Sequence, residues 1–213
     1  MSIRRLTVRY SETDLDIKQL DASQWSDAPL GLVGTYWSGD AAPAIRHFTA
    51  KLLWSDTTLY VRLEADQSEP LVISDTPDTS SKTLGLWDRD VCEIFIAPDK
   101  MAPNRYFEFE IAPTGEWLDL AIDSTSGQRV IDRDYASGME SAARIDKDKI
   151  VLAIKIPFSA FGKTPKHGDI WLGNLFRCVG EGATRGYLAW QPTKTKTPNF
   201  HVPAAFGEFE FVR

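Results

Sequence analysis

Short runs rich in Val, Ile, Phe, Tyr and Trp, separated by clusters of Gly, Pro, Asp and Ser, dominate the chain. This pattern is typical of β-strands joined by turns, and the periodicity of an amphipathic helix is nearly absent. The clearest alternation lies in residues 105–112. One face of this predicted strand carries Phe107, Phe109 and Ile111, and the other carries Tyr106, Glu108 and Glu110. The turn at residues 113–115 then leads into a strand at 117–122, so the pattern predicts a hairpin.

The same reasoning predicts further strands along the chain. They are 49–54 paired with 59–65, 91–97, 142–145 paired with 149–156, 170–179, 187–190 and 206–212. Roughly ten strands with short turns favour two packed antiparallel layers, because an open sheet would expose its edges and one apolar face. We therefore expect an all-β protein, an antiparallel β-sandwich of the jelly-roll type.

Two polar stretches interrupt the strands, residues 66–86 and 123–139. Their content of Ser, Thr, Asp, Gly and Pro predicts long loops, which on a rigid sandwich often carry function. No internal repeat or change in composition marks a boundary. We expect residues 1–213 to form one domain.

Composition and charge narrow the class of protein. Hydrophobic residues make up 43% and charged residues 25%, which indicates a globular chain. The net charge of -6 and a pI near 5.1 argue against nucleic acid as a partner, because phosphates would repel this surface. No stretch predicts a membrane span, and the first ten residues lack the apolar region of a signal peptide. Cys92 and Cys178 are expected to be buried free thiols.

One segment, Leu86-Trp87-Asp88-Arg89-Asp90-Val91-Cys92-Glu93-Ile94-Phe95-Ile96-Ala97-Pro98, passes from a Trp through acidic residues into a strand that carries Glu93. Further short motifs follow the same order as in a known family. They are Trp54-Ser55-Asp56, Tyr106-Phe107-Glu108-Phe109, Pro113-Thr114-Gly115, Ile156-Pro157-Phe158, Gly168-Asp169-Ile170-Trp171, Asn174-Leu175-Phe176-Arg177, Leu188-Ala189-Trp190 and Phe200-His201-Val202-Pro203. From about Ala50 onward the chain resembles a family 9 carbohydrate-binding module.

The resemblance implies a DOMON-like β-sandwich that binds a terminal sugar between two Trp rings and does not change it chemically. At the matching positions, Trp87 and Trp190 are expected to be the two walls, and Glu93 to accept hydrogen bonds from sugar hydroxyls. The family's sugar-contacting basic residue has no clear counterpart, and Arg105 is the nearest candidate. The resemblance also implies an extracellular or periplasmic location, a mono- or oligosaccharide ligand and an associated glycoside hydrolase as a partner.

A sugar ring presents C-H groups on its faces and hydroxyls around its rim, so its site needs an aromatic face and polar groups in the plane of the ring. The polar candidates are Glu93, Asn174, Arg177 and Gln191. Glu93 has an alternative interpretation as an ion-pair partner of Arg105 or Arg177. The remaining residues near these motifs are expected to be structural, namely Trp54, Trp117, Trp171 and His201.

Two other functions compete with sugar binding. A glycosidase would use paired carboxylates, for which Asp88 with Asp90 and Glu108 with Glu110 are candidates, although such pairs are also common on the solvated face of a sheet. A haem-binding redox module would need axial ligands, and these would have to come from His47, His167, His201, Met101 and Met139. No cofactor is expected, and the acidic loops 75–78 and 132–134 leave structural calcium open.

Overall fold

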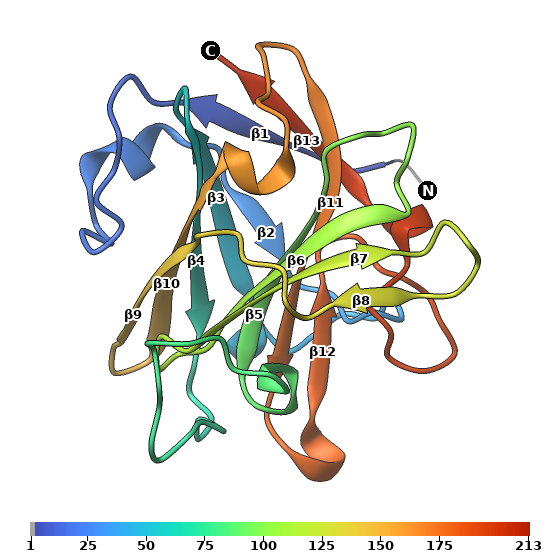
Figure 1. Cartoon of the computed structure of the whole chain (residues 1–213). Coiled ribbons are helices and arrows are strands. Elements are labelled where there is room, and N and C mark those ends of the chain that lie inside the picture. Colours follow the sequence, from blue (N-terminus) through green and yellow to red (C-terminus); the bar gives the residue numbers. More distant parts are fainter. Residues whose placement is uncertain (1–2) are drawn as a thin grey trace.

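The computed structural model describes residues 3–213, whose regular structure consists of β-strands and short 3-10 turns (Figure 1). The strands are β1 (Arg5–Tyr10), β2 (Gly31–Val33), β3 (Phe48–Trp54), β4 (Thr58–Asp66), β5 (Val91–Ala97), β6 (Arg105–Ile111), β7 (Trp117–Asp123), β8 (Val130–Asp132), β9 (Glu140–Ile145), β10 (Lys149–Pro157), β11 (Ile170–Val179), β12 (Gly186–Ala189) and β13 (Gly207–Val212). The 3-10 turns are η1 (Ser23–Asp27), η2 (Ala44–Arg46), η3 (Leu86–Asp88), η4 (Phe158–Phe161), η5 (Gly182–Thr184) and η6 (Pro203–Ala205). Within residues 3–213, no helix has the length and apolar character needed to cross a membrane.

All strands belong to one curled sheet with the order β8-β7-β6-β5-β11-β13-β1-β3-β4-β10-β9. Strand β12 adds to β11, and β2 adds to β3. Neighbours are antiparallel except for β1, which pairs in parallel with both β13 and β3. The sheet folds over so that β5, β6 and β11 form one layer and β3, β4 and β10 form the other (Figure 1). This arrangement confirms the predicted all-β sandwich.

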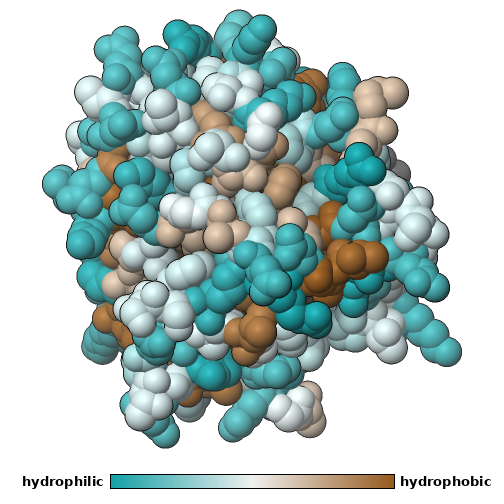
Figure 2. All heavy atoms as spheres, viewed as in Figure 1, coloured by the Kyte–Doolittle hydropathy of each residue, from teal (hydrophilic) through white to brown (hydrophobic). Residues whose placement is uncertain are grey.

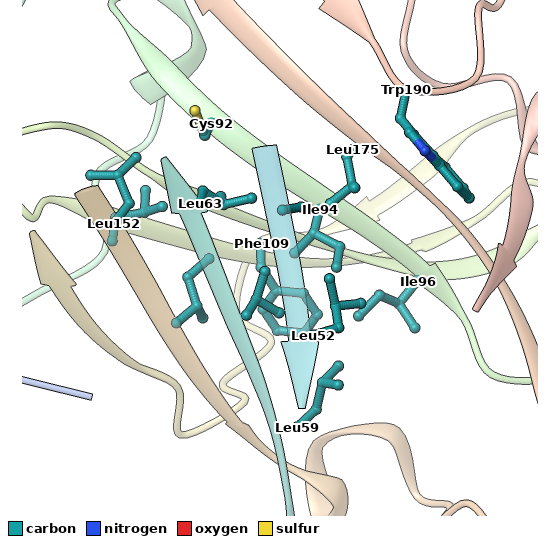
Figure 3. Close-up of a cluster of buried hydrophobic side chains, with 14 of the residues drawn as sticks. Leu52, Leu59, Leu63, Cys92, Ile94, Ile96, Phe109, Leu152, Leu175 and Trp190 are labelled. Atoms are coloured by element: carbon teal, nitrogen blue, oxygen red, sulfur yellow. The ribbon is translucent and has the colours of Figure 1, made fainter. Parts of the chain in front are cut away.

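The main hydrophobic core lies between the two layers. Ile94 and Phe109 come from one layer, and Leu52, Leu63 and Leu152 come from the other (Figure 3). These positions belong to the inward-facing series of each strand, so the alternation of the sequence directly selects the core face. Burial of this face supplies the main driving force that holds the layers together.

Each layer also has a covered outer face. Leu15 and Trp25, from the segment that includes η1, pack against Tyr60 and Val151 on the outside of β4 and β10. On the outside of the other layer, a second cluster joins residues of β5, β6, β7 and β11, among them Phe95 and Phe176. The loops therefore cover apolar surface that a simple two-layer sandwich would expose to water.

The predicted hairpins are present as β3–β4, β6–β7 and β9–β10. The sequence pattern did not predict β1, β2 or β8, and the last two have only three residues each. In the predicted loop 66–86, only Asp66, the last residue of β4, belongs to a strand, whereas 123–139 includes β8 as well as the last residue of β7. Both cysteines are buried free thiols, which confirms that expectation. Figure 2 shows the same view with hydrophilic side chains over most of the surface and hydrophobic ones in small separate groups.

Candidate functional site

A pocket of about 450 Å³ opens on the outer face of the layer that contains β5, β6 and β7. Strand residues form its floor, and loop residues form its walls. The lining consists of Trp87, Asp88, Glu93, Phe95, Glu108, Leu120, Arg129, Ile131, Arg133, Cys178, Arg185, Tyr187, Pro198, Asn199, Phe200 and His201. The mixture of aromatic faces with carboxyl, guanidinium and amide groups suits a ligand that has both apolar and hydroxyl-rich surfaces.

Three carboxyl groups gather here: Glu93 and Glu108 line the pocket, and Glu110 lies next to them without lining it. Glu93 on β5 lies directly across from Glu110 on β6, and Glu108 follows on the same face of β6. All three are buried, and one carboxylate oxygen from each lies within 4.8 Å of the others. One interpretation of the sequence was that Glu108 and Glu110 lie on the solvated face of a sheet. That interpretation is wrong, because the face of β6 that carries them is covered by loops and by the second hydrophobic cluster.

Burial changes the acidity of these groups. Loss of hydration raises the pKa of Glu93 and Glu110 well above the usual value, and the neighbouring carboxylates raise it further. Burial also raises the pKa of Glu108. Glu93 accepts a hydrogen bond from the Cys178 thiol at 3.5 Å, and neither Arg105 nor Arg177 forms the ion pair that the sequence left open.

His201 lies beside this cluster. Its Nδ1 is 2.9 Å from the Tyr106 hydroxyl, and its Nε2 is 3.9 Å from a Glu108 carboxylate oxygen. Burial, together with the charge of Arg129, lowers the pKa of His201 to about 3, so the ring is neutral at pH 7. Sequence reasoning left His201 out of the site, whereas the structure places it in the pocket lining.

Trp87 stands at the pocket with 40% of its surface exposed, in turn η3 between the long loop and β5. The guanidinium of Arg185 holds this segment in place by donating to the carbonyl oxygens of Trp87, Arg89 and Gly180. The same guanidinium lies over the Tyr187 ring, 5.5 Å from its centroid. A large aromatic face is therefore fixed in an accessible position.

Trp190 occupies a different environment. Its ring is only 2% exposed and stacks on Phe209, with the centroids 5.7 Å apart and the planes at 24°. Figure 3 shows it among the buried hydrophobic side chains near Leu175 and Ile96. Trp190 does not line the pocket, and this placement corrects the expectation of a clamp between Trp87 and Trp190. The physical reason is that β12 ends beside β13, where the indole fills the interior instead of facing a ligand.

The other polar candidates also lie outside the pocket lining. The buried Asn174 amide donates a hydrogen bond to the Gln191 carbonyl oxygen and accepts one from the Gln191 backbone N-H. The Gln191 side-chain oxygen accepts a hydrogen bond from the Arg4 backbone N-H. Arg177 is buried and donates to the carbonyl oxygens of Arg46 and Asp66. Arg105 is exposed and pairs with Asp123. Of the seven residues expected to contact sugar, the structure brings only Trp87 and Glu93 together at the pocket.

Several pocket residues were not found by sequence reasoning. Arg129 and Arg133 come from the second long loop, and Phe200 comes from the segment after β12. The signal that could have found Arg129 and Arg133 is their position in a long loop, because long loops on a rigid sandwich often carry function. That signal indicates a region and does not indicate individual residues. Phe200 stacks on Phe176 at a centroid distance of 4.1 Å, and this packing fixes its position at the pocket wall.

The residues expected to be structural are mostly confirmed as such. Trp54 and Trp171 are buried in the main core, and Trp117 is half-buried with its indole N-H donating to the Thr79 carbonyl. In the acidic loops, the Asp78 carboxylate accepts from Ser80 and Ser81. Within residues 3–213, Glu93, Glu108 and Glu110 form the one group in which three carboxylate, imidazole or thiol ligand atoms lie close together.

Comparison with known proteins gives a consistent result. Residues 18–213 match the family model described as carbohydrate family 9 binding domain-like. A structure from Bacteroides uniformis ATCC 8492, whose proposed role is carbohydrate binding, has a TM-score of 0.77 at 16% identity and covers 99% of this chain and 100% of its own.

Two structures of a family 9 carbohydrate-binding module from Caldicellulosiruptor kristjanssonii are also similar. The complex with cellotriose has a TM-score of 0.69 at 16% identity, covering 98% of this chain and 94% of its own. The complex with glucose has a TM-score of 0.68 at 17% identity, and it covers 99% of this chain and 97% of its own. No curated protein matches the chain significantly. At these identities the structures support the fold, and the family model covers most of the chain.

Proposed function

The chain belongs to the carbohydrate family 9 binding domain-like family, and on this premise we propose that it binds a carbohydrate in the pocket lined by Trp87 and Glu93. The family is one of non-catalytic sugar-binding modules, so the chain is not an enzyme. We also propose that residues 1–213 act as one binding unit. The observation that carries the proposal is an accessible indole beside a polar pocket floor.

The chemistry of the pocket supports this function. A sugar ring has an apolar face that suits the exposed Trp87 indole, and its rim hydroxyls suit groups that donate and accept hydrogen bonds. Asn199 can do both, and the guanidinium groups of Arg129 and Arg133 can donate. A protonated Glu93 or Glu108 can both donate and accept, which matches a hydroxyl better than a carboxylate alone.

The proposed binding mode differs from a sandwich between two tryptophans. Trp87 supplies one aromatic surface, while Trp190 is buried in the main core, stacked on Phe209. Phe200 and Tyr187 are the other aromatic residues with partly exposed rings at the pocket, and they belong to separate segments from Trp87. We therefore propose that the sugar lies against Trp87, with Phe200 or Tyr187 as the second apolar contact.

Calorimetric titration with glucose, cellotriose and a panel of other mono- and oligosaccharides tests the proposal. We expect saturable binding of modest affinity, because a sugar exchanges hydrogen bonds with water for hydrogen bonds with protein at little net gain. Trp87→Ala should weaken binding at least about tenfold, which corresponds to about 1.4 kcal/mol.

Leu84→Ala is the matched control, because Leu84 is an exposed apolar residue of the same loop that does not line the pocket. This variant should bind sugar as the unaltered protein does. If no sugar of the panel gives heat, or if Trp87→Ala binds with unchanged affinity while remaining folded, the proposed site is incorrect.

A further inference from the structure

We propose that Glu93, Glu108 and Glu110 bind a hard divalent cation at the floor of the pocket. This inference concerns a metal site and does not depend on sugar binding, although Glu93 and Glu108 also line the proposed sugar site. It rests on the arrangement of the three carboxylates, on their missing hydrogen bonds and on the lack of a positive side chain in contact with them.

The geometry comes directly from the register of the sheet. Glu93 and Glu110 are cross-strand partners, and Glu108 lies two residues from Glu110 on the same face. One oxygen from each lies within 4.8 Å of the others. Calcium binds oxygen at about 2.3–2.6 Å, so two ligands on opposite sides of one ion lie up to about 5 Å apart. The three oxygens can therefore surround a single ion with only small side-chain adjustments.

The second observation is the lack of partners for buried oxygen atoms. Both carboxylate oxygens of Glu110 and one of Glu108 are buried without a hydrogen bond, and Glu110 is 0% exposed. A buried polar atom without a partner is costly, and in a native protein it calls for an unseen water, ion or proton. The Glu110 side chain lies among the other two carboxylates, where a shared cation would satisfy all of them.

The third observation concerns charge. Among residues 3–213, no Lys or Arg nitrogen lies within 4.0 Å of these carboxylates, and the nearest imidazole nitrogen, His201 Nε2, is 3.9 Å from Glu108. Three negative charges cannot remain buried without compensation, so the cluster must hold either a cation or protons. A bound cation and bound protons would each provide partners for the carboxylate oxygens. An experiment can distinguish the two because only the first requires a metal.

The ligand set identifies the class of ion. All three groups offer oxygen, which hard cations such as Ca²⁺, Mg²⁺ and Mn²⁺ prefer. The nearby Cys178 thiol donates a hydrogen bond to Glu93 at 3.5 Å, and the ligand group consists of the three carboxylates. Water from the open pocket can complete the coordination.

The test is a titration of metal-free protein with Ca²⁺, Mg²⁺ and Mn²⁺, each alone and without sugar. Calorimetry measures heat and stoichiometry, and the loss of the free Mn²⁺ signal in electron paramagnetic resonance measures Mn²⁺ binding. We expect one ion per chain. At a free concentration of 100 times Kd, the ratio of folded to unfolded protein should rise about 100-fold, which raises the melting temperature.

Glu110→Gln separates the metal site from the sugar site, because Glu110 does not line the pocket. The variant keeps the side-chain shape and removes one ligand charge, so binding should weaken at least tenfold. Glu12→Gln alters an exposed carboxylate elsewhere and should leave metal binding unchanged. If Glu110→Gln does not fold, Glu108→Gln replaces it, and metal binding by this variant should also weaken at least tenfold.

Two results would overturn the metal site. One is the absence of heat, Mn²⁺ uptake and thermal shift at millimolar ion, which would mean that protons alone neutralise the cluster. The other is unchanged metal binding by Glu110→Gln, which would locate the ion elsewhere. Sugar titrations in the presence of a chelator are independent of these outcomes, so failure of the sugar proposal and failure of the metal proposal give different results.

Discussion

Trp87 and Trp190 show how the surroundings of a side chain decide its contribution. Trp87 follows a polar loop and stays 40% exposed because Arg185 anchors its backbone at the pocket. Trp190 directly follows β12 and is 2% exposed, with its indole stacked on Phe209. Gly207 is also required there, since a Cβ at that position would lie 2.3 Å from the Trp190 ring. One indole is available for binding, and the other maintains the core.

Trp190→Ala should therefore lower the free energy of unfolding by about 3–5 kcal/mol, the cost of removing a large aromatic side chain from a packed interior. Trp87→Ala should change it by less than about 0.5 kcal/mol, because the side chain is partly exposed. Urea unfolding followed by circular dichroism measures both values. Equal stability of Trp190→Ala and the unaltered protein would contradict the interior placement of this residue.

Sequence reasoning at the level of residues succeeded through the resemblance to a known family. That resemblance singled out Trp87 and, six residues later, Glu93, and both residues line the pocket. It failed for Asn174, Arg177 and Gln191. Their side chains bond to backbone groups that are distant in sequence, and no local pattern reveals those partners.

At the level of elements, strand alternation fixes which side chains face the core and which face the pocket. In β6, Phe109 and Ile111 enter the main core, while Tyr106, Glu108 and Glu110 face the outer side. The alternation was predicted, but the burial of that outer side was not. Its cover comes from turn η3 and from the segment near residue 200, both of which are irregular. Patterns of period two carry no information about such segments.

Arg185 joins turn η3 and its end to the loop after β11 at Gly180, and its replacement tests whether these contacts position Trp87. Arg185→Lys keeps the charge but loses the planar set of donors that reaches the Trp87, Arg89 and Gly180 carbonyls. We expect sugar affinity to fall about tenfold, or about 1.4 kcal/mol. Hydrogen exchange should become faster at residues 86–89 and stay unchanged in the strands of the core.

Arg9→Lys is the control, because Arg9 is exposed on β1. The exchange measurement separates positioning from direct contact. If affinity falls while exchange at residues 86–89 is unchanged, Arg185 acts on the ligand itself and does not hold the loop.

At the level of the whole molecule, β1 and β13 connect the two layers into one sheet. Strand β1 pairs in parallel with β13, from the opposite end of the sequence, and also with β3. The pairing with β13 joins segments about 200 residues apart, such as Arg5 opposite Glu208. The hairpins could be predicted because they are local. The closure of the sheet could not be, because it depends on pairings that only the assembled layers determine.

The buried carboxyl cluster also affects the stability of the molecule as a whole. In metal-free protein, the folded-state pKa values of Glu93, Glu108 and Glu110 exceed those in the unfolded chain. Above pH of about 4.5 the folded state therefore binds more protons than the unfolded state, and stability falls as pH rises. Each group lowers the free energy of unfolding by up to about 1.4 kcal/mol per pH unit until its folded-state pKa is reached.

His201 acts in the opposite direction over part of this range. Its pKa is lowered to about 3, so the unfolded chain binds the proton first, and stability is lost as pH falls below about 6.5. Between pH 5 and 7, two carboxyl groups whose pKa is raised well above the usual value, Glu93 and Glu110, oppose one imidazole. We expect the urea midpoint in the presence of a chelator to be higher at pH 5 than at pH 7, and the difference to shrink in Glu110→Gln. A midpoint that instead rises with pH would mean that the cluster is ionised in the folded protein without a cation.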